Sequence, residues 1–240
     1  MRAASVALSL AAAASCGPCS RPAVPILTWH AVSQGPSGDA FTVSELNFTQ
    51  QLDALSGYQT VSFHELLEGN LPARALILTF DDGTEDAFTR VLPELKKRKL
   101  RATFFLVSGF LGPDPAHRHV EPNGARYLIW SEVQALREAG MEIGSHSVDH
   151  ARLPDLPEAR VREELVRSKA ELEAGLGAPV EVFAYPFNSV RRSTRAQVVA
   201  AGYRAAAAGT VHGSGDRFEL YRIGVYRDTS AANLLALLPQ

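Results

Sequence analysis

Short apolar runs alternate with longer amphipathic segments from residue 24 onward. Apolar runs of four or five residues are typical of buried strands, and their alternation with amphipathic segments is typical of a parallel sheet covered by helices. Seven runs predict strands, over residues 26–30, 76–80, 103–107, 142–145, 181–185, 204–208 and 222–226. Seven strands with helices between them fit a closed or nearly closed α/β barrel better than an open sheet.

The intervening segments predict five helices, over residues 44–55, 63–68, 86–99, 131–139 and 157–176. A capping box of Ser131 and Gln134 predicts the start of the fourth helix, and Gly140 predicts its end. The fifth helix is amphipathic, with one apolar face for the sheet. The stretch over residues 109–127 contains several Pro and Gly residues and predicts one long irregular segment, a kind that often carries function.

The first twenty residues have the pattern of an export signal. Met1 and Arg2 give a short positive region, residues 3–14 are apolar, and a run of small residues ends at Cys16. This order is typical of a secretory signal, which is removed from the mature protein. The alternative is a lipoprotein signal that leaves Cys16 acylated, although Ala13 stands where such signals usually have Leu.

The two cysteines of the chain, Cys16 and Cys19, stand in the order Cys-Gly-Pro-Cys, which in isolation resembles a thioredoxin redox motif. A redox pair of this kind follows a strand and opens a helix whose N-terminus lowers the thiol pKa. Here the pair follows the signal-like segment and precedes Arg21 and Pro22. We therefore interpret it as part of the export signal, which leaves the rest of the chain without cysteine.

Composition and charge bear on the kind of partner. The 240 residues include 24 Lys and Arg and 26 Asp and Glu, a formal net charge of −2. Nucleic-acid-binding domains usually show a basic excess or stripe, and the one dense basic run, residues 96–101, ends a predicted helix, where it complements the helix dipole. After residue 20 no stretch approaches the roughly 18 apolar residues of a membrane-spanning helix. We expect neither a nucleic-acid partner nor a membrane span.

Charged and imidazole side chains come directly after three of the predicted strands. Asp81 and Asp82 follow the second strand, His146 and His150 follow the fourth, and His30 ends the first. Parallel strands of a barrel bring their C-terminal ends to one rim, where the active sites of such folds lie. We therefore expect these five side chains to lie together.

Two histidines four positions apart and a carboxylate from another strand make a site that suits Zn²⁺ or Fe²⁺ and leaves coordination positions open. We assign Asp82, His146 and His150 as the metal ligands. Adjacent residues on a strand point to opposite sides, so Asp81 stays free to take a proton from water activated at the metal, provided that Gly83 turns the chain. The arrangement predicts metal-assisted hydrolysis.

Three segments resemble the motifs of the polysaccharide deacetylases, the fourth carbohydrate esterase family: Thr-Phe-Asp-Asp-Gly at 79–83, His-Ser-Val-Asp-His at 146–150 and Phe-Ala-Tyr-Pro-Phe at 183–187. The resemblance covers about residues 24–228. It implies a distorted (β/α) barrel with about seven strands and a divalent metal, commonly zinc, that serves the removal of acetyl groups from polysaccharides. It matches Asp81 to the general base, and Asp82, His146 and His150 to the metal ligands.

The third motif departs from the commonest form of the family, because Ala184 stands where that form has an Arg that contacts the base. This departure leaves the charged partner of Asp81 open. The motif resembles instead the subgroup that acts on poly-β-1,6-N-acetylglucosamine in biofilm matrices, which has Gly where this chain has Asn188. Asn tolerates left-handed backbone angles, so we expect the turn to persist. The match implies that the Phe187 N–H binds the oxyanion and places Tyr185 at the oxyanion and substrate site.

The general acid departs from the family pattern as well. Many members carry it as a His in a Leu-x-His motif near the C-terminus, and the strand here reads Leu-Tyr-Arg-Ile at 220–223. The poly-N-acetylglucosamine subgroup resembles this chain in the early segment Leu-Thr-Trp-His-Ala-Val at 27–32, which assigns the acid to His30. His212 is the reserve candidate. The other histidines outside these motifs are interpreted as structural or solvated: His64, His117 and His119.

Because one metal must gather all of these groups, residues 21–240 are expected to form a single domain after a signal over residues 1–20. The expected protein is a secreted or periplasmic, zinc-dependent N-deacetylase of an N-acetylglucosamine-containing polysaccharide, bound to a membrane surface only if Cys16 is lipidated. A non-catalytic glycan-binding relative is the alternative, motivated by the missing Arg at position 184. An Fe²⁺ oxygenase fits less well, because those enzymes usually show His-x-Asp or His-x-Glu followed much later by His.

Overall fold

The structure is a computed structural model that describes residues 24–35, 37–209 and 216–238. The predicted signal over residues 1–20 and the reserve candidate His212 lie outside the described residues. Within them, no helix is both long enough and apolar enough to cross a membrane.

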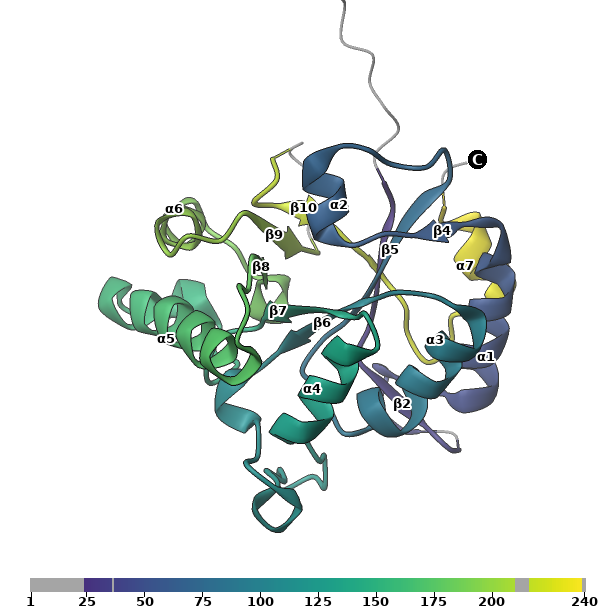
Figure 1. The fold of residues 1–240 in the computed structure, drawn as a ribbon, viewed down its shortest axis with the longest axis horizontal. Coiled ribbons are helices and arrows are strands. Elements are labelled where there is room, and N and C mark those ends of the chain that lie inside the picture. Colours follow the sequence, from purple (N-terminus) through teal and green to yellow (C-terminus); the bar gives the residue numbers. More distant parts are fainter. Residues whose placement is uncertain (1–23, 36, 210–215, 239–240) are drawn as a thin grey trace, which may run out of the picture.

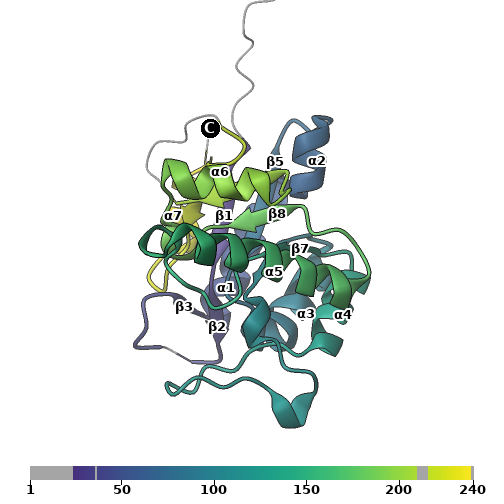
Figure 2. The ribbon, with the colours of Figure 1, turned by 90° about the vertical axis from the view of Figure 1, so that its left-hand side faces the viewer.

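One sheet of parallel strands forms the centre of the molecule, and helices surround it (Figures 1 and 2). Its strands neighbour one another in the order β10-β9-β8-β7-β6-β5-β1-β11, and β4 pairs with the start of β5. The bounds are β1 (Ile26–Trp29), β4 (Gln59–Thr60), β5 (Ala75–Phe80), β6 (Thr103–Leu106), β7 (Glu142–Ser145), β8 (Val182–Ala184), β9 (Ala205–Ala208), β10 (Leu220–Tyr221) and β11 (Ile223–Gly224). A separate pair joins β2 (Ala31–Ser33) to β3 (Thr42–Ser44).

The two edges of the sheet are joined by one short segment. β10 pairs with β9 at one edge and β11 pairs with β1 at the other, and Arg222 alone separates β10 from β11. The Arg222 N–H donates to the Ala208 carbonyl at 3.1 Å, while the Val225 N–H donates to the Thr28 carbonyl at 2.8 Å. The sheet is therefore nearly closed into a distorted (β/α) barrel, which confirms the predicted fold.

Helices cover the outside of this barrel because each buries one apolar face against it. In the order of the chain they are α1 (Glu45–Ala54), α2 (Phe63–Glu68), α3 (Leu92–Arg98), α4 (Trp130–Glu138), α5 (Glu158–Leu176), α6 (Arg192–Ala200) and α7 (Ala231–Ala236). α1 and α7 pack side by side, as Figure 1 shows. The strands β1, β5, β6, β8 and β9 are buried along their whole length, as apolar runs without alternation indicate.

Each of the seven ranges predicted as strands contains an observed strand, and each of the five ranges predicted as helices contains an observed helix. The seventh strand begins two residues early and is split at Arg222. The predicted capping box of Ser131 and Gln134 is wrong: α4 begins at Trp130, and the Glu132 carboxylate accepts from the Ile129 N–H at 3.1 Å. Glu132 supplies the cap because it lies three positions after Ile129, the residue at which extended backbone ends.

The irregular segment predicted over residues 109–127 lies at the end of the barrel toward which the strands run. Figures 1 and 2 place it at the same end of the molecule as β2, which directly follows β1. Backbone bridges join Thr84 to Tyr127 and Gly112 to Ile129, so the segment is tied to the residues that follow β5. It forms one wall of the rim where the polar motifs gather.

Candidate active site

The two aspartates after β5 are separated by a turn. The Asp81 N–H still donates to the Trp29 carbonyl in the sheet at 3.0 Å, whereas Asp82 and Gly83 adopt φ angles of 70° and 77°. A Cβ at position 83 would lie 2.9 Å from the Leu106 side chain, so both the backbone angle and the space favour glycine there. The turn begins at Asp82 rather than at Gly83 alone, and it directs the two carboxylates differently.

The histidine motif after β7 is a second compact turn. Ser147 and His150 have φ angles of 68° and 53°. Glu164 of α5 is buried beneath the turn, and its Oε2 accepts from the Val148 N–H at 2.9 Å and from the Asp149 N–H at 3.0 Å. A buried carboxylate thus fixes the backbone between the two histidines.

The three predicted ligands meet at the rim. Asp82 Oδ1 lies 3.5 Å from His146 Nε2 and 3.3 Å from His150 Nε2. Two ligand atoms bound to a tetrahedral cation at about 2.1 Å lie about 3.4 Å apart, which matches both distances. Asp82 Oδ1 is buried without a hydrogen-bond partner. The donor set and its spacing therefore fit a divalent cation, and the residues that would hold it are Asp82, His146 and His150.

Hydrogen bonding and burial set the protonation of these groups. His146 Nδ1 donates to the Ala184 carbonyl at 2.8 Å, so its Nε2 lone pair faces Asp82. Burial lowers the pKa of His146 to about 3 and also lowers the pKa of His150. Burial raises the pKa of Asp82 to about 6, against the opposing charge of His30. Neutral imidazoles beside a buried carboxylate oxygen that accepts no hydrogen bond are suited to a cation.

Asp81 has a charged partner that the sequence analysis missed. Arg222 Nη1 and Nη2 donate to its two carboxylate oxygens at 2.7 and 2.8 Å, and both side chains are buried. Burial alone would raise the pKa of Asp81, but the Arg222 guanidinium, together with His146, holds it well below its usual range. Asp81 therefore has a charged partner although position 184 carries no Arg, because Arg222, between β10 and β11, supplies it.

Asn188 supports the same arginine. Its backbone adopts a φ of 50°, as expected for a residue that replaces Gly in the turn after β8. Its side-chain Oδ1 accepts from Arg222 Nη2 at 3.0 Å. Asn188 thus makes the turn and also helps to orient the partner of Asp81.

The remaining predicted residues lie at different depths. His30 is partly buried, its Nδ1 has no hydrogen-bond partner, and its ring centroid lies 4.9 Å from that of Phe41. Phe187 is exposed, with its ring centroid 4.6 Å from that of His150. Tyr185 differs from the expectation: it is fully buried, and its hydroxyl donates to the Phe218 carbonyl at 3.0 Å. Its side chain packs in the core and is not exposed at the rim.

The irregular segment brings a further group to the site. Burial raises the pKa of Tyr127 to about 12, and the charges of Asp82 and Glu121 add to this rise. The charge of Glu121 also raises the pKa of His150, against the larger lowering caused by burial. Tyr127 and Glu121 therefore lie near the metal-ligand group, in the segment that Pro and Gly content alone had marked as functional.

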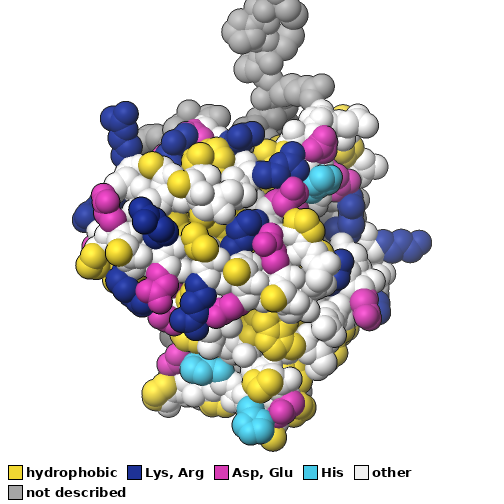
Figure 3. Space-filling view, turned by 60° about the vertical axis from the view of Figure 1, so that its left-hand side comes forward, with side chains coloured by type: hydrophobic (Ala, Val, Ile, Leu, Met, Phe, Trp, Pro, Cys, Tyr) yellow, Lys and Arg dark blue, Asp and Glu magenta, His cyan; other side chains and the backbone are white. Residues whose placement is uncertain are grey.

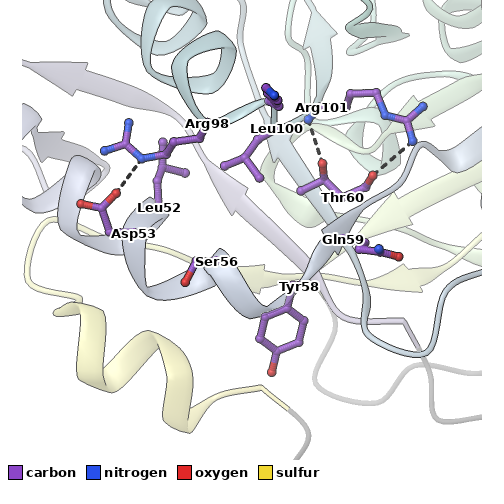
Figure 4. Close-up of a pocket in the computed structure, with 10 residues that line it drawn as sticks. Leu52, Asp53, Ser56, Tyr58, Gln59, Thr60, Arg98, Leu100 and Arg101 are labelled. Atoms are coloured by element: carbon purple, nitrogen blue, oxygen red, sulfur yellow. Dashed lines mark hydrogen bonds and ion pairs between the residues drawn. The ribbon is translucent and has the colours of Figure 1, made fainter.

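A pocket of about 500 Å³ lies at the opposite end of the barrel, between α1, β4 and the residues that precede β6 (Figure 4). Its arginines are already paired: Arg98 with Asp53 at 2.7 Å, and Arg101 with Glu65 at 2.9 Å. The face drawn in Figure 3 likewise intersperses Lys and Arg with Asp and Glu. The pocket gathers no group suited to hydrolysis, and the site at the rim is the better candidate.

The Glu164→Gln substitution is expected to raise the dissociation constant of a bound cation about 10- to 100-fold, the usual cost of losing an orienting group behind a ligand. The amide keeps the volume of Glu164 but accepts more weakly from the Val148 and Asp149 N–H groups. Zinc titration against a competing chelator measures the change. Glu163→Gln is the matched control, because the neighbouring Glu163 is exposed and pairs with Arg160. Equal affinities in the two variants would contradict the role of Glu164.

Comparisons with known proteins agree with this geometry. The model of the polysaccharide deacetylase family matches residues 68–206, more than half of the chain. The Bacillus subtilis protein YxkH is 27% identical over 188 residues, which cover 75% of this chain and 62% of YxkH. The poly-beta-1,6-N-acetyl-D-glucosamine N-deacetylase of Staphylococcus aureus is 24% identical over 162 residues, which cover 61% of this chain and 54% of that enzyme. The matches thus span between half and two thirds of these relatives.

Among solved structures, the Streptococcus pyogenes deacetylase PplD in complex with acetate superimposes with a TM-score of 0.79 over 90% of this chain and 98% of PplD, at 24% identity. This likeness concerns the fold. The matched residues 68–206 contain both aspartates, both ligand histidines and the turn at Phe187. The chain belongs to the polysaccharide deacetylase family.

Proposed function

We propose that the protein is a zinc-dependent N-deacetylase of an N-acetylglucosamine-containing polysaccharide, and that it releases acetate by hydrolysis of the carbon–nitrogen bond. The observation that carries this proposal is the pairing of two unlike carboxylates at one rim: Asp82 faces two neutral histidines, while Asp81 is held ionised by Arg222. The similarity to the Staphylococcus aureus deacetylase supports an N-acetylglucosamine polymer as the substrate.

A divalent cation held by Asp82, His146 and His150 would acidify water and polarise the acetyl carbonyl. Asp81 accepts the proton of the attacking water, because its carboxylate is ionised and fixed by two hydrogen bonds from Arg222. Water adds its oxygen to the acetyl carbon, and the Phe187 N–H donates to the oxyanion. His30 then gives a proton to the nitrogen as the carbon–nitrogen bond breaks, which yields a free amine and acetate.

The near-neutral net charge of the chain and its signal-like first segment support a substrate outside the cytoplasm. A net charge of −2 suits an uncharged acetylated glycan. The signal-like segment over residues 1–20 is consistent with a secreted or periplasmic protein. Cell fractionation with an antibody against the chain, and mass spectrometry of its N-terminus, test the location and the lipidation of Cys16.

Acetate release from a panel of polymers tests the proposed activity. β-1,6-linked N-acetylglucosamine oligomers, chitin oligomers, peptidoglycan and acetylxylan are incubated with the purified zinc-loaded protein. We expect acetate from the first of these, loss of that activity on chelation and its return with zinc. Binding of an oligomer without acetate release from any polymer would favour the non-catalytic relative. Acetate from acetylxylan alone would contradict an N-deacetylase.

A further inference from the structure

Four aromatic side chains are exposed in the part of the chain that the structure describes: Phe41, Phe187, Tyr221 and Tyr226. Phe187 contacts His150 of the metal-ligand group, Phe41 contacts His30 at the same rim, and Tyr226 contacts Phe41. Folded chains bury most aromatic surface, so a group of exposed rings at a catalytic rim indicates a surface for a ligand.

The ring contacts extend outward from the site on two sides. On one side the His30 ring lies 4.9 Å from Phe41, which meets Tyr226 in an edge-to-face contact at 5.7 Å. On the other side Phe187 lies 4.6 Å from His150. We call the pair of Phe41 and Tyr226 the aromatic platform.

The aromatic platform and Phe187 follow strands on opposite sides of β5 in the sheet order. Asp82 follows β5, and the neighbours of β5 on one side are β1 and β11, which His30 and Tyr226 follow. On the other side of β5 the order is β6, β7 and β8, and Phe187 follows β8. Figure 2 shows β2 and β3, next to Phe41, at the same end of the molecule as the irregular segment of the site. Exposed rings thus flank the metal-ligand group from both sides.

The aromatic platform is built into the fold. A Cβ at position 224 would lie 2.5 Å from the Tyr226 hydroxyl, so the Tyr226 side chain rests on the bare backbone of Gly224. The Arg227 N–H donates to the Ala40 carbonyl at 2.8 Å, which joins the segments that carry the two rings. With 46% of each side chain exposed, the platform offers an apolar surface that needs little reordering when a ligand binds.

We propose that the aromatic platform is a subsite for a sugar ring of the same glycan, next to the unit whose acetamide is hydrolysed, and that Phe187 contacts the chain on the other side. A pyranose ring presents C–H groups on its faces and hydroxyls at its edges, and it stacks on an aromatic face in the manner of apolar rings. The protein then acts on units inside a chain. This inference rests on the proposed function, because that function supplies the glycan.

Chain-length dependence tests the platform. For the unaltered protein, kcat/KM for acetate release is expected to rise from the N-acetylglucosamine monomer to a pentamer of β-1,6-linked N-acetylglucosamine. Phe41→Ala is expected to lower kcat/KM for the pentamer about tenfold, as the loss of one stacked ring predicts, and to leave kcat/KM for the monomer, which does not reach the platform, nearly unchanged. Phe41→Trp keeps an aromatic face and is expected to keep the preference. Tyr221→Ala is the matched control, since Tyr221 is 43% exposed and makes no contact with the other rings.

Equal losses for monomer and pentamer in Phe41→Ala, or the same loss in Tyr221→Ala, would overturn the platform while the deacetylase activity stands. If no oligomer releases acetate, the proposed function fails instead. Calorimetric titration of the protein with the pentamer then tests whether the platform binds the glycan. Weaker binding by Phe41→Ala than by the unaltered protein supports it, and equal affinities overturn it. Melting curves of the variants are expected to match that of the unaltered protein, because Phe41 is half exposed.

Discussion

The Asp81→Asn variant is expected to release acetate with a kcat about 10²- to 10⁴-fold lower than that of the unaltered protein, the range for losing a general base. The Asn side chain has nearly the same shape as Asp but cannot take a proton from water. Asp81 is the carboxylate that Arg222 keeps ionised through two hydrogen bonds, whereas Asp82 faces the histidines. Initial rates on the pentamer at saturating zinc measure the effect.

Asp53→Asn is the control for this variant, because Asp53 is an exposed aspartate at the opposite end of the barrel that pairs with Arg98. It is expected to keep the activity of the unaltered protein. Zinc content and circular dichroism of the Asp81→Asn protein show whether cation and fold are kept. An Asp81→Asn protein that is folded, loaded with zinc and within threefold of full activity would rule out Asp81 as the base.

The Arg222→Met variant is expected to lower the free energy of unfolding by about 3–5 kcal/mol, because it leaves the buried Asp81 carboxylate without its partner. The Met side chain has a similar length and fills much of the same volume. Its kcat is expected to fall as well, since the carboxylate loses both of the hydrogen bonds that orient it. Urea unfolding followed by circular dichroism gives the stability, and acetate release gives the rate.

The double variant Asp81→Asn/Arg222→Met separates the ion pair from simple loss of packing. It replaces the buried pair with two uncharged side chains, so it is expected to be more stable than the sum of the two single losses predicts. Arg222→Lys keeps the charge but not the two-point geometry and is expected to fall between the unaltered protein and Arg222→Met. Strictly additive losses would show that Arg222 and Asp81 are not coupled.

The strands of the central sheet could be predicted because a buried strand appears in the sequence as a short run of apolar residues. Residues 76–80 and 103–106 are apolar except for one threonine each, and every residue in them is buried, as in a strand covered on both faces. β2 and β3 could not be predicted, because each is three residues long and buries only its central residue. The start of α4 lies one residue before the predicted one, because Ser131 and Gln134 have the residue types of a capping box whereas the path of the backbone places the cap at Ile129, with the Glu132 carboxylate.

The metal-ligand group could be predicted from strand ends and spacing, but the partner of Asp81 could not. Arg222 lies 141 positions away, and only the closing of the barrel brings it to the base. One signal was present: an arginine inside the apolar run 220–226 needs a buried partner, because an isolated charge is rarely buried. The depth of Tyr185 could not be predicted from its motif, because the burial of its side chain and the hydrogen bond from its hydroxyl to the Phe218 carbonyl depend on the folded core.

The closing segment over residues 220–224 has a consequence for the order of synthesis. It is synthesised after the other strands of the sheet, joins both edges of the sheet and delivers Arg222 to Asp81. The same segment therefore closes the barrel and completes the base. A nascent chain that has not yet reached it contains Asp82, His146 and His150 but no Arg222 to pair with Asp81.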